Sequence, residues 1–357
     1  MSISLTETSK LSTDILLKGI IETIVKDSPI LQELPFIQIV GNSLKYNREK
    51  TLPTVAWYDP VTDTWTTSEP EFEQCSASLC ILGGDADVDN FLKATRSNIQ
   101  DLEAAVIEQK AKALRNEFEY AFLNGDSSVN SKQPDGLYKT MKGTAWEAST
   151  AYSLGDVVVP TAGLENGFRY ECTTAGTSDV SEPTWPTTEG ETVDDNTATW
   201  TCRLGNHLGS GANGATLALS KIDQLIDLVK GGKPDLLLMS RRSRRKITAL
   251  ARAAGTNLLI GEGKLGQVVE YYNGIPVAVS DWVKDNYTVG TSTDCSAIFA
   301  FQMGEGAVCG LTSPEMIQVE RLGSLETKDA SRTRVKWYVS LANFSIVKAA
   351  MLTGVRD

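Results

Sequence analysis

The feature that most constrains the fold is a long helical pattern over residues 89–123. Its apolar side chains recur every three or four residues, as in a helix that buries one face; they are Phe91, Leu92, Ile99, Leu102, Val106, Ala113, Phe118 and Phe122. One helix of this length would extend roughly 50 Å. Asp85, Asp87 and Asp89 can cap its start, and Asn124-Gly125-Asp126 ends it. We therefore expect a long helix to run along the molecule.

The residues before this helix have no core of their own. Residues 1–46 predict an arm, in which a helical apolar pattern over 15–25 is followed by an extended piece ending at Leu34-Pro35-Phe36. Residues 47–84 predict a long β-hairpin that turns at 59–63. Its flanks carry Trp57, Tyr58 and Trp65, with little local sequence to bury them. We expect another subunit to cover these aromatic side chains.

Residues 143–204 have a different composition. They combine many threonine and glycine residues with scattered aromatic residues, and they show no helical periodicity. They also hold ten acidic residues against only Arg169 and Arg203, which is most of the net charge of −11. This stretch predicts a small all-β module inserted into a host of mixed helices and strands.

The remainder of the chain alternates helices and strands. After a glycine-rich joint at 205–214, a helical pattern covers 217–229. Strands are expected at 236–239, 275–279, 297–301 and 334–341, and a helix at 241–254. No run approaches the ~18 apolar residues that cross a bilayer, and no export signal is present, so no membrane partner is expected.

Histidine and cysteine usage argues against an enzyme or a metal protein. His207 is the single histidine, and the six cysteines contain no C-x-x-C pair. Cys172 and Cys202 fall in two strand-like segments, so a disulfide between them is an alternative to six reduced thiols. We expect no catalytic residues, no metal and no cofactor.

Three short motifs resemble ligand-binding sites, but we prefer a structural role for each. Asp85, Asp87 and Asp89 resemble the start of a calcium loop, but Asn90 and Arg96 occupy its required glycine and glutamate positions. Residues 261–265 lack the hydroxyl side chain that a phosphate-binding loop uses for magnesium. The basic run over 241–246 can bind nucleic acid, but a solvated or inter-subunit surface is the commoner role of such a run.

The aromatic residues of 143–204 allow two roles. Flat rings can stack on sugar faces, and Trp146, Tyr170 and Trp185 are the candidates for glycan contact. The alternative is that a module of ~60 residues needs these rings for its own core. We favour the core for Tyr152 and Trp200.

The order of segments resembles a known family. An arm, a long hairpin, a helix ending in Asn124-Gly125-Asp126 and a loop to Asp135-Gly136-Leu137 come first. The strand 236–239, a helix ending at Gly255, and the run Asn273 to Asp281 follow. This order resembles the major capsid protein of tailed bacteriophages, of the Hong Kong 97 type, over about 1–142 and 215–357.

The resemblance implies an α+β fold with named parts. Residues 1–46 would be the N-terminal arm, 47–84 the extended loop and 85–142 the peripheral domain with its spine helix. Residues 143–204 would be the inserted β module, which is similar to chitin-binding-type carbohydrate-binding modules. The remaining parts would be a peripheral helix, the axial domain, peripheral strands and an axial C-terminal strand, over 205–233, 234–315, 316–344 and 345–357 respectively.

The resemblance also implies a function and partners. The chain would assemble with itself into hexamers and pentamers and form the icosahedral head of a virion, built in the bacterial host cytoplasm. The shell would enclose double-stranded DNA without sequence-specific binding. No charged scaffold-like domain precedes the arm, so a separate scaffolding protein is expected, the alternative being that the chain is a mature form. A portal and a decoration protein are further expected partners. An encapsulin-like cellular compartment and a carbohydrate-binding surface protein are the alternatives.

Overall fold

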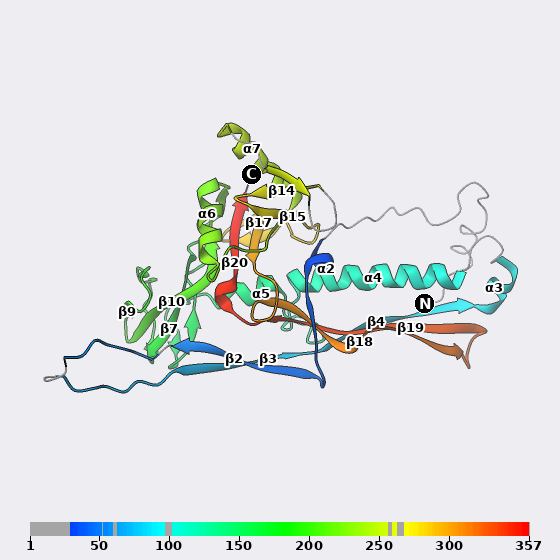
Figure 1. Ribbon diagram of the computed structural model, residues 1–357, viewed down its shortest axis with the longest axis horizontal. Helices are drawn as coiled ribbons and strands as arrows, with labels where there is room; N and C mark the ends of the chain where they lie inside the picture. Colours follow the sequence, from blue (N-terminus) through cyan, green and yellow to red (C-terminus); the bar gives the residue numbers. More distant parts are fainter. Residues whose placement is uncertain are drawn as a thin grey trace.

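The computed structural model describes residues 29–51, 53–59, 63–96, 102–255, 259–262 and 268–356. A long peripheral sheet and a larger central sheet organise these residues (Figure 1). The predicted helix at 15–25 lies outside the described residues. No helix among the described residues is long and apolar enough to span a membrane.

The peripheral sheet has four strands in the order β1-β18-β19-β4. Their bounds are Phe36–Gln38, Val308–Ser324, Ala330–Asn343 and Cys80–Asp89, in that order. β18 and β19 form a long antiparallel pair, and β19 also pairs antiparallel with β4. β1 follows a short helix, α2 (Ile30–Glu33), at the end of the arm where the sequence predicted an extended piece.

The long helical pattern appears as two described helices, α3 (Asn90–Arg96) and α4 (Leu102–Asn124), with 97–101 outside the described residues. α4 lies along the peripheral sheet (Figure 1), where its Phe118 joins the core that contains Val335 and Trp337 of β19. A long helix therefore does lie on the sheet, but it is α4 over Leu102–Asn124 and not one described helix over 89–123.

The predicted caps are only partly right. Asp89 Oδ1 accepts a hydrogen bond from the Phe91 backbone N–H at 2.8 Å, so Asp89 caps α3. Asp85 and Asp87 instead lie within β4, directly opposite Arg334 and Arg332 of β19. Cross-strand charge pairing, rather than helix capping, explains these two carboxylates.

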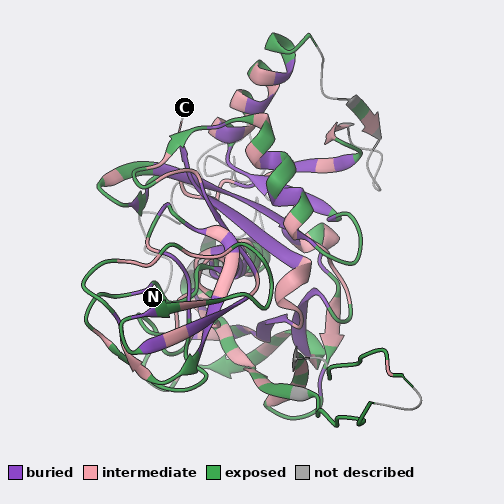
Figure 2. Ribbon diagram, turned by 90° about the vertical axis from the view of Figure 1, so that its left-hand side faces the viewer, coloured by how far each residue is buried: buried purple, intermediate pink, exposed green. Residues whose placement is uncertain are grey.

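The central sheet places β12 (Leu236–Met239), β17 (Ser292–Phe301) and β20 (Ala349–Arg356) side by side. Alternate side chains of these strands enter two separate cores, as the two-residue period of a strand requires. One core lies under α2, α4 and α5 (Leu137–Lys142), and the other under α6 (Leu219–Leu228). Figure 2 shows these strands as buried.

Several predicted elements of the C-terminal part are confirmed. α7 (Arg241–Ala253) follows β12, and its N-cap Ser240 accepts a hydrogen bond from the Ser243 backbone N–H. β15 (Ile275–Val279), β17 and β19 cover the expected strands. The other elements here are β13 (Leu259–Glu262), β14 (Val268–Tyr272), β16 (Tyr287–Val289) and the 3₁₀ helix η1 (Ile346–Lys348).

Residues 143–204 contain strands and no helix in the part of the chain that the structure describes. They form β5 (Ala151–Tyr152), β6 (Val157–Val158), β7 (Asn166–Thr174), β8 (Gly176–Thr177), β9 (Thr192–Asp195) and the first half of β10 (Ala198–Gly209). These strands enclose an aromatic core of their own, centred on Trp200. For the rest of this article we call residues 143–204 the module.

Strands β6, β7, β9 and β10 of the module continue the central sheet, and β10 is the strand that pairs with its β20. β10 continues past residue 204, and its end, His207 to Gly209, pairs in parallel with β20. The predicted glycine-rich joint at 205–214 is therefore wrong for its first half, because 205–209 are strand residues; β11 (Ala215–Thr216) follows them. Cys172 and Cys202 are free thiols, as are the other four cysteines, so the alternative of a disulfide is not realised.

Candidate assembly surface

A projecting β-hairpin is the main candidate surface. Its strands β2 (Ser43–Thr51) and β3 (Glu71–Ser78) pair antiparallel with each other and with no other strand of the described chain. The expected bounds of 47–84 were too far along the chain, because residues 80–89 form β4 of the peripheral sheet. The hairpin extends well beyond the body of the molecule (Figure 1).

The distal part of the hairpin, residues 53–59 and 63–69, has no strand structure, although the sequence placed strand flanks there. Local contacts order it instead. Tyr58 and Trp65 stack with ring centroids 4.4 Å apart, and the Tyr58 hydroxyl lies 3.0 Å from Thr66 Oγ1. Hydrogen bonding to Thr66 lowers the pKa of Tyr58. The two sides of the loop therefore hold each other without strand pairing.

The aromatic side chains of this loop face solvent in the single chain. Trp57 is 102% exposed and Trp65 is 77% exposed. Figure 2 draws the distal part of the hairpin as exposed almost throughout. Large exposed aromatic groups on a projecting element are typical of a surface that another molecule covers. The sequence predicted the exposure of these residues, and their contact with another subunit remains a proposal.

The base of the hairpin is fastened to the end of β19. The Tyr46 hydroxyl donates to the Asn343 carbonyl at 3.1 Å, and its ring meets Phe344 edge-on at 4.7 Å. The Arg48 guanidinium donates to the carbonyls of Asn343 and Phe344. Both side chains come from β2, so the direction in which the hairpin projects is set by contacts with residues 343–344.

Paired charges bind the peripheral sheet on the face away from α4. Arg334 Nε donates to Asp85 Oδ1 at 2.6 Å, and Arg332 Nε donates to Asp87 Oδ1 at 2.6 Å. Each arginine makes a second bond to the same carboxylate, so both pairs are bidentate. These hydrogen bonds hold the pKa values of Asp85 and Asp87 below the usual 3.8. Asp85 and Asp87, two of the three carboxylates that resembled a calcium loop, thus form ion pairs with arginines.

The candidate glycan residues lie in the module core. Trp146 and Tyr170 are buried. The Tyr170 ring stacks on Trp185, with centroids 4.2 Å apart, and its hydroxyl donates to the Pro186 carbonyl at 2.7 Å. Trp185 is partly buried and packs against the same core, and its Nε1 donates to Glu182 at 2.7 Å. Because Trp146 and Tyr170 are enclosed, they offer no ring face to a sugar in this conformation. Tyr152 and Trp200 pack in this core, as predicted.

A buried carboxylate that the sequence reasoning missed organises this core. Asp195 Oδ2 accepts the indole N–H groups of Trp146 at 2.8 Å and Trp200 at 3.0 Å. Asp195 Oδ1 accepts the Asp179 backbone N–H at 2.8 Å. The neighbouring acidic residue, Asp194, is exposed, and the sequence does not distinguish the two. Burial of one of two adjacent aspartates depends on the strand register of β9 and β10.

Replacing Asp195 with asparagine is expected to cost about 2–3 kcal/mol of unfolding free energy, because its amide cannot accept from all three donors and a buried N–H loses its partner. Urea denaturation followed by tryptophan fluorescence measures this loss. Asp194→Asn is the matched control and should change stability by less than about 0.5 kcal/mol. Equal effects of the two substitutions would refute the role of Asp195.

The basic run over 241–246 is partly paired within the chain. Arg241 Nε donates to Asp281 at 2.7 Å, and Arg244 Nη1 donates to Glu270 at 3.1 Å. Arg242 lies 3.5 Å from Asp285. Gly261 and Glu262 of the glycine-rich loop belong to β13, and residues 263–265 lie outside the described residues. Ion pairs within the chain therefore involve three of the five cations of the basic run, a role that was not predicted from the sequence.

Among the described residues, no group of three or more His, Cys, Asp or Glu side chains could hold a metal ion. His207 is buried, and its ring nitrogens lie near the Lys142 carbonyl and the Thr353 hydroxyl. The features that the geometry does provide are a projecting aromatic hairpin, a charged sheet face and a module with its own aromatic core.

Comparison with known proteins agrees with this geometry. The family model described as Phage capsid family matches residues 12–180, which cover most of the predicted arm, the hairpin, the long helical pattern and part of the module. No curated protein matches the chain.

Solved structures with the same fold cover nearly the whole chain. The capsid of cyanophage A-1(L) matches with a TM-score of 0.63 and 10% identity, covering 99% of this chain and 100% of that one. The SrpI encapsulin of Synechococcus elongatus PCC 7942 matches with a TM-score of 0.61 and 13% identity, covering 99% and 96%. Microbacterium phage Oxtober96 matches at 0.58 and 13%, covering 99% of each chain. The chain therefore has the fold of phage capsid proteins, which confirms the predicted mixed helix-and-strand capsid fold.

Proposed function

We propose that this chain is the major capsid protein of a tailed bacteriophage, and that it assembles with copies of itself into the icosahedral head around double-stranded DNA. The observation that carries the proposal is the projecting hairpin with exposed Trp57 and Trp65 on a capsid fold. The central sheet would serve as the axial domain, and α4 with the peripheral sheet as the peripheral domain.

The proposed mechanism is mechanical. A neighbouring subunit would cover the distal hairpin, and every subunit would make the same contact once and receive it once, as repeated interfaces in closed shells require. Each contact contributes modestly, but the closed shell adds them over all subunits. Hexamers and pentamers, a separate scaffolding protein, a portal and a decoration protein are the expected partners. The enclosed DNA would be held without sequence-specific contacts.

A second candidate is the shell of a cellular compartment. The encapsulin match has a TM-score of 0.61, close to the 0.63 of the cyanophage capsid, so the fold does not separate the two uses. The contents of the shell separate them. A phage head holds DNA, whereas a compartment of the encapsulin kind would hold protein cargo.

The purified chain, with a scaffolding protein from its genomic neighbourhood where needed, is expected to form closed particles of tens of nanometres. Electron microscopy measures the particles, and nuclease-protected nucleic acid in particles from the native host distinguishes a phage head from a protein-loaded compartment. A chain that stays monomeric under all of these conditions would rule out both shell functions.

The module would be displayed on the outer face of the shell. Its acidic, hydrophilic composition suits a solvent-facing position, and that position leaves the interior of the shell free for DNA. Glycan binding by Trp146, Tyr170 and Trp185 is not part of the proposal, because the first two of these rings are buried. An excision that tests the module should end before β10, since residue 204 lies inside that strand.

A further inference from the structure

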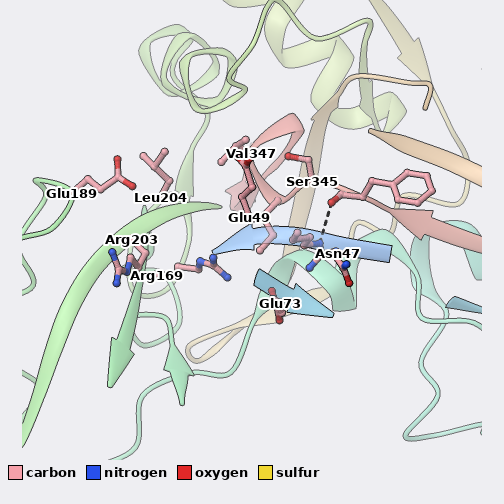
Figure 3. Close-up of a pocket in the computed structure, with 12 residues that line it drawn as sticks. Asn47, Glu49, Glu73, Arg169, Glu189, Arg203, Leu204, Ser345 and Val347 are labelled. Carbon is pink, nitrogen blue, oxygen red and sulfur yellow. Dashed lines mark hydrogen bonds between the residues drawn. The ribbon is translucent and has the colours of Figure 1, made fainter. Parts of the chain in front are cut away.

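A cavity lies where the hairpin base, the module and the segment after β19 meet (Figure 3). Its volume is about 580 Å³, and residues 47–49, Glu73, Arg169, Glu189, 203–204 and 344–347 line it. A second recess of about 250 Å³ shares Glu73, Arg169 and Arg203 with it. Arg169 and Arg203 therefore line both the cavity and the recess, together with Glu73 of the hairpin.

The strand register sets these two arginines against each other. Arg169 of β7 and Arg203 of β10 are direct cross-strand partners. Like charges at such positions repel each other and destabilise a sheet. Arg203 has a counter-ion, since its Nε lies 3.0 Å from Glu171 Oε2. Arg169 has none within ion-pair distance among the described residues, so the repulsion is only partly compensated.

Arg169 also has an unpaired buried donor. Its Nε is shielded from solvent and has no hydrogen-bond partner. A buried N–H without an acceptor is costly, and native proteins rarely keep one without a reason. Burial lowers the pKa of Arg169; among the nearby charges Glu73 has the largest effect and raises the pKa, while Arg48 and Arg203 lower it. Glu73 is thus the main nearby source of negative charge, but it forms no ion pair with Arg169 in the described structure.

Arg48 supplies a third guanidinium from the hairpin side of the cavity. Its hydrogen bonds go to neutral acceptors, the Tyr46 hydroxyl and two backbone carbonyls, which fix its position without cancelling its charge. Glu49, Glu73 and Glu189 line the same cavity, but none of them forms an ion pair with Arg169 or Arg48 in the described structure. Of these three arginines, only Arg203 has a carboxylate as its ion-pair partner, that of Glu171.

We propose that Arg169 and Arg203, with Arg48 across the cavity, form a binding site for a small oxyanion of phosphate or carboxylate chemistry. The planar guanidinium matches such groups with two parallel hydrogen bonds. A bound oxyanion would accept from the guanidinium groups of Arg169 and Arg203 that line the cavity, and it would separate the opposed charges of β7 and β10. It would also link the module to the hairpin base through Arg48. This site does not depend on shell formation.

Inorganic phosphate is the probe for the test. The melting temperature of the purified chain should rise by a few degrees in phosphate relative to chloride at matched ionic strength and pH 7, because a ligand of the folded state stabilises it. Arg169→Gln should abolish that rise and weaken phosphate affinity, measured by titration calorimetry, at least about tenfold. In chloride alone, Arg169→Gln should not lower the melting temperature, since the repulsion with Arg203 is removed.

Three further variants keep the result interpretable. Arg245→Gln, an exposed arginine of α7 away from the cavity, should keep the full phosphate effect. Arg169→Lys retains the charge and should bind phosphate more weakly than the wild type but more tightly than Arg169→Gln. Glu73→Gln should tighten phosphate binding, because it removes a competing carboxylate from the cavity. A loss of phosphate binding in Glu73→Gln would contradict the proposal.

Measurements at several protein concentrations distinguish a free anion from a carboxylate of a second copy of the chain. A free anion stabilises the chain to the same extent at every protein concentration. If the acceptor is a carboxylate from a second copy of the chain, Arg169→Gln should lower stability without added phosphate, and increasingly so as the protein concentration rises. A wild-type chain that responds equally to phosphate and chloride, with no concentration-dependent effect of Arg169→Gln, would overturn the site.

Discussion

Replacing Trp57 and Trp65 together with serine is expected to leave a folded subunit that no longer forms particles. In the single chain Trp57 contacts almost nothing, and Trp65 contacts mainly Tyr58, so folding should lose little. In a shell these rings would be the buried centre of an interface. Tryptophan is enriched among interface residues whose truncation costs about 2–4 kcal/mol. Every subunit of the shell would lose this contribution.

Electron microscopy and sedimentation measure assembly, and circular dichroism with urea denaturation measures folding. Val129→Ser is the control, since Val129 is also an exposed apolar residue, at 87%, but lies in the loop after α4. It should leave both assembly and folding unchanged. Normal particles from the double tryptophan variant would show that the hairpin tip is not an assembly contact. An unfolded variant would contradict the exposure on which the prediction rests.

The elements that could be predicted from sequence are those fixed by local periodicity. The apolar stripe of α4 predicts a helix because one face of that helix is buried. The apolar run of β12 predicts a strand that is buried on both faces. The exposure of Trp57 was also predictable, since the neighbouring sequence offers no core. The strand flanks around it were wrong, since residues 53–59 and 63–69 form no ladder and only side-chain contacts such as the Tyr58–Trp65 stack join them.

What the sequence could not provide is which strands meet. Asp85 and Asp87 were assigned to a helix cap because they precede a helical pattern, yet their partners Arg332 and Arg334 lie almost 250 residues away. Arg169 and Arg203 were recognisable only as the two cations of an acidic stretch. Their opposition follows from a register that no local pattern encodes. The same holds for Asp195, whose indole partners come from different parts of the module.

His207 lies at another such contact between distant strands, and its surroundings there could not be predicted from the sequence. At the point where β10 joins β20, its Nδ1–H donates to the Lys142 carbonyl at 3.2 Å, so Nε2 of the neutral ring accepts from the Thr353 hydroxyl at 2.9 Å. Glu165 Oε1 lies 3.7 Å away, and Glu165 Oε2 accepts the Gly163 backbone N–H. A single histidine thus lies at the connection between the module and the central sheet.

The stability of the subunit is expected to fall as the pH decreases from 6.5 to about 4. Burial lowers the pKa of His207 to about 4, and the nearby Lys142 charge acts in the same direction. The unfolded chain therefore takes up a proton near pH 6.5 while the folded chain resists it until about pH 4. The contribution is fully present above pH 6.5 and is lost as pH falls, by about 3 kcal/mol in total.

Glu165 acts in the opposite direction. Burial raises its pKa above the usual 4.5, so the folded chain keeps that proton longer, and stability from this group decreases as pH rises through the raised value. The aspartates with lowered pKa, such as Asp85 and Asp87, act below pH 3.8 and so lie outside this window. The net slope between pH 4.5 and 6.5 is therefore the difference between His207 and Glu165.

Urea denaturation of the unassembled subunit at several pH values between 4 and 7 separates the two groups. Glu165→Gln should make the fall in stability steeper than in the wild type, because the opposing group is gone. His207→Gln should remove the fall or reverse its sign, since only Glu165 then titrates in the window. The single imidazole also permits a direct proton NMR titration of the folded chain, in which His207 should titrate near pH 4. A folded-state titration near 6.5, or an unchanged slope in His207→Gln, would show that the ring is not buried at this connection as the geometry requires.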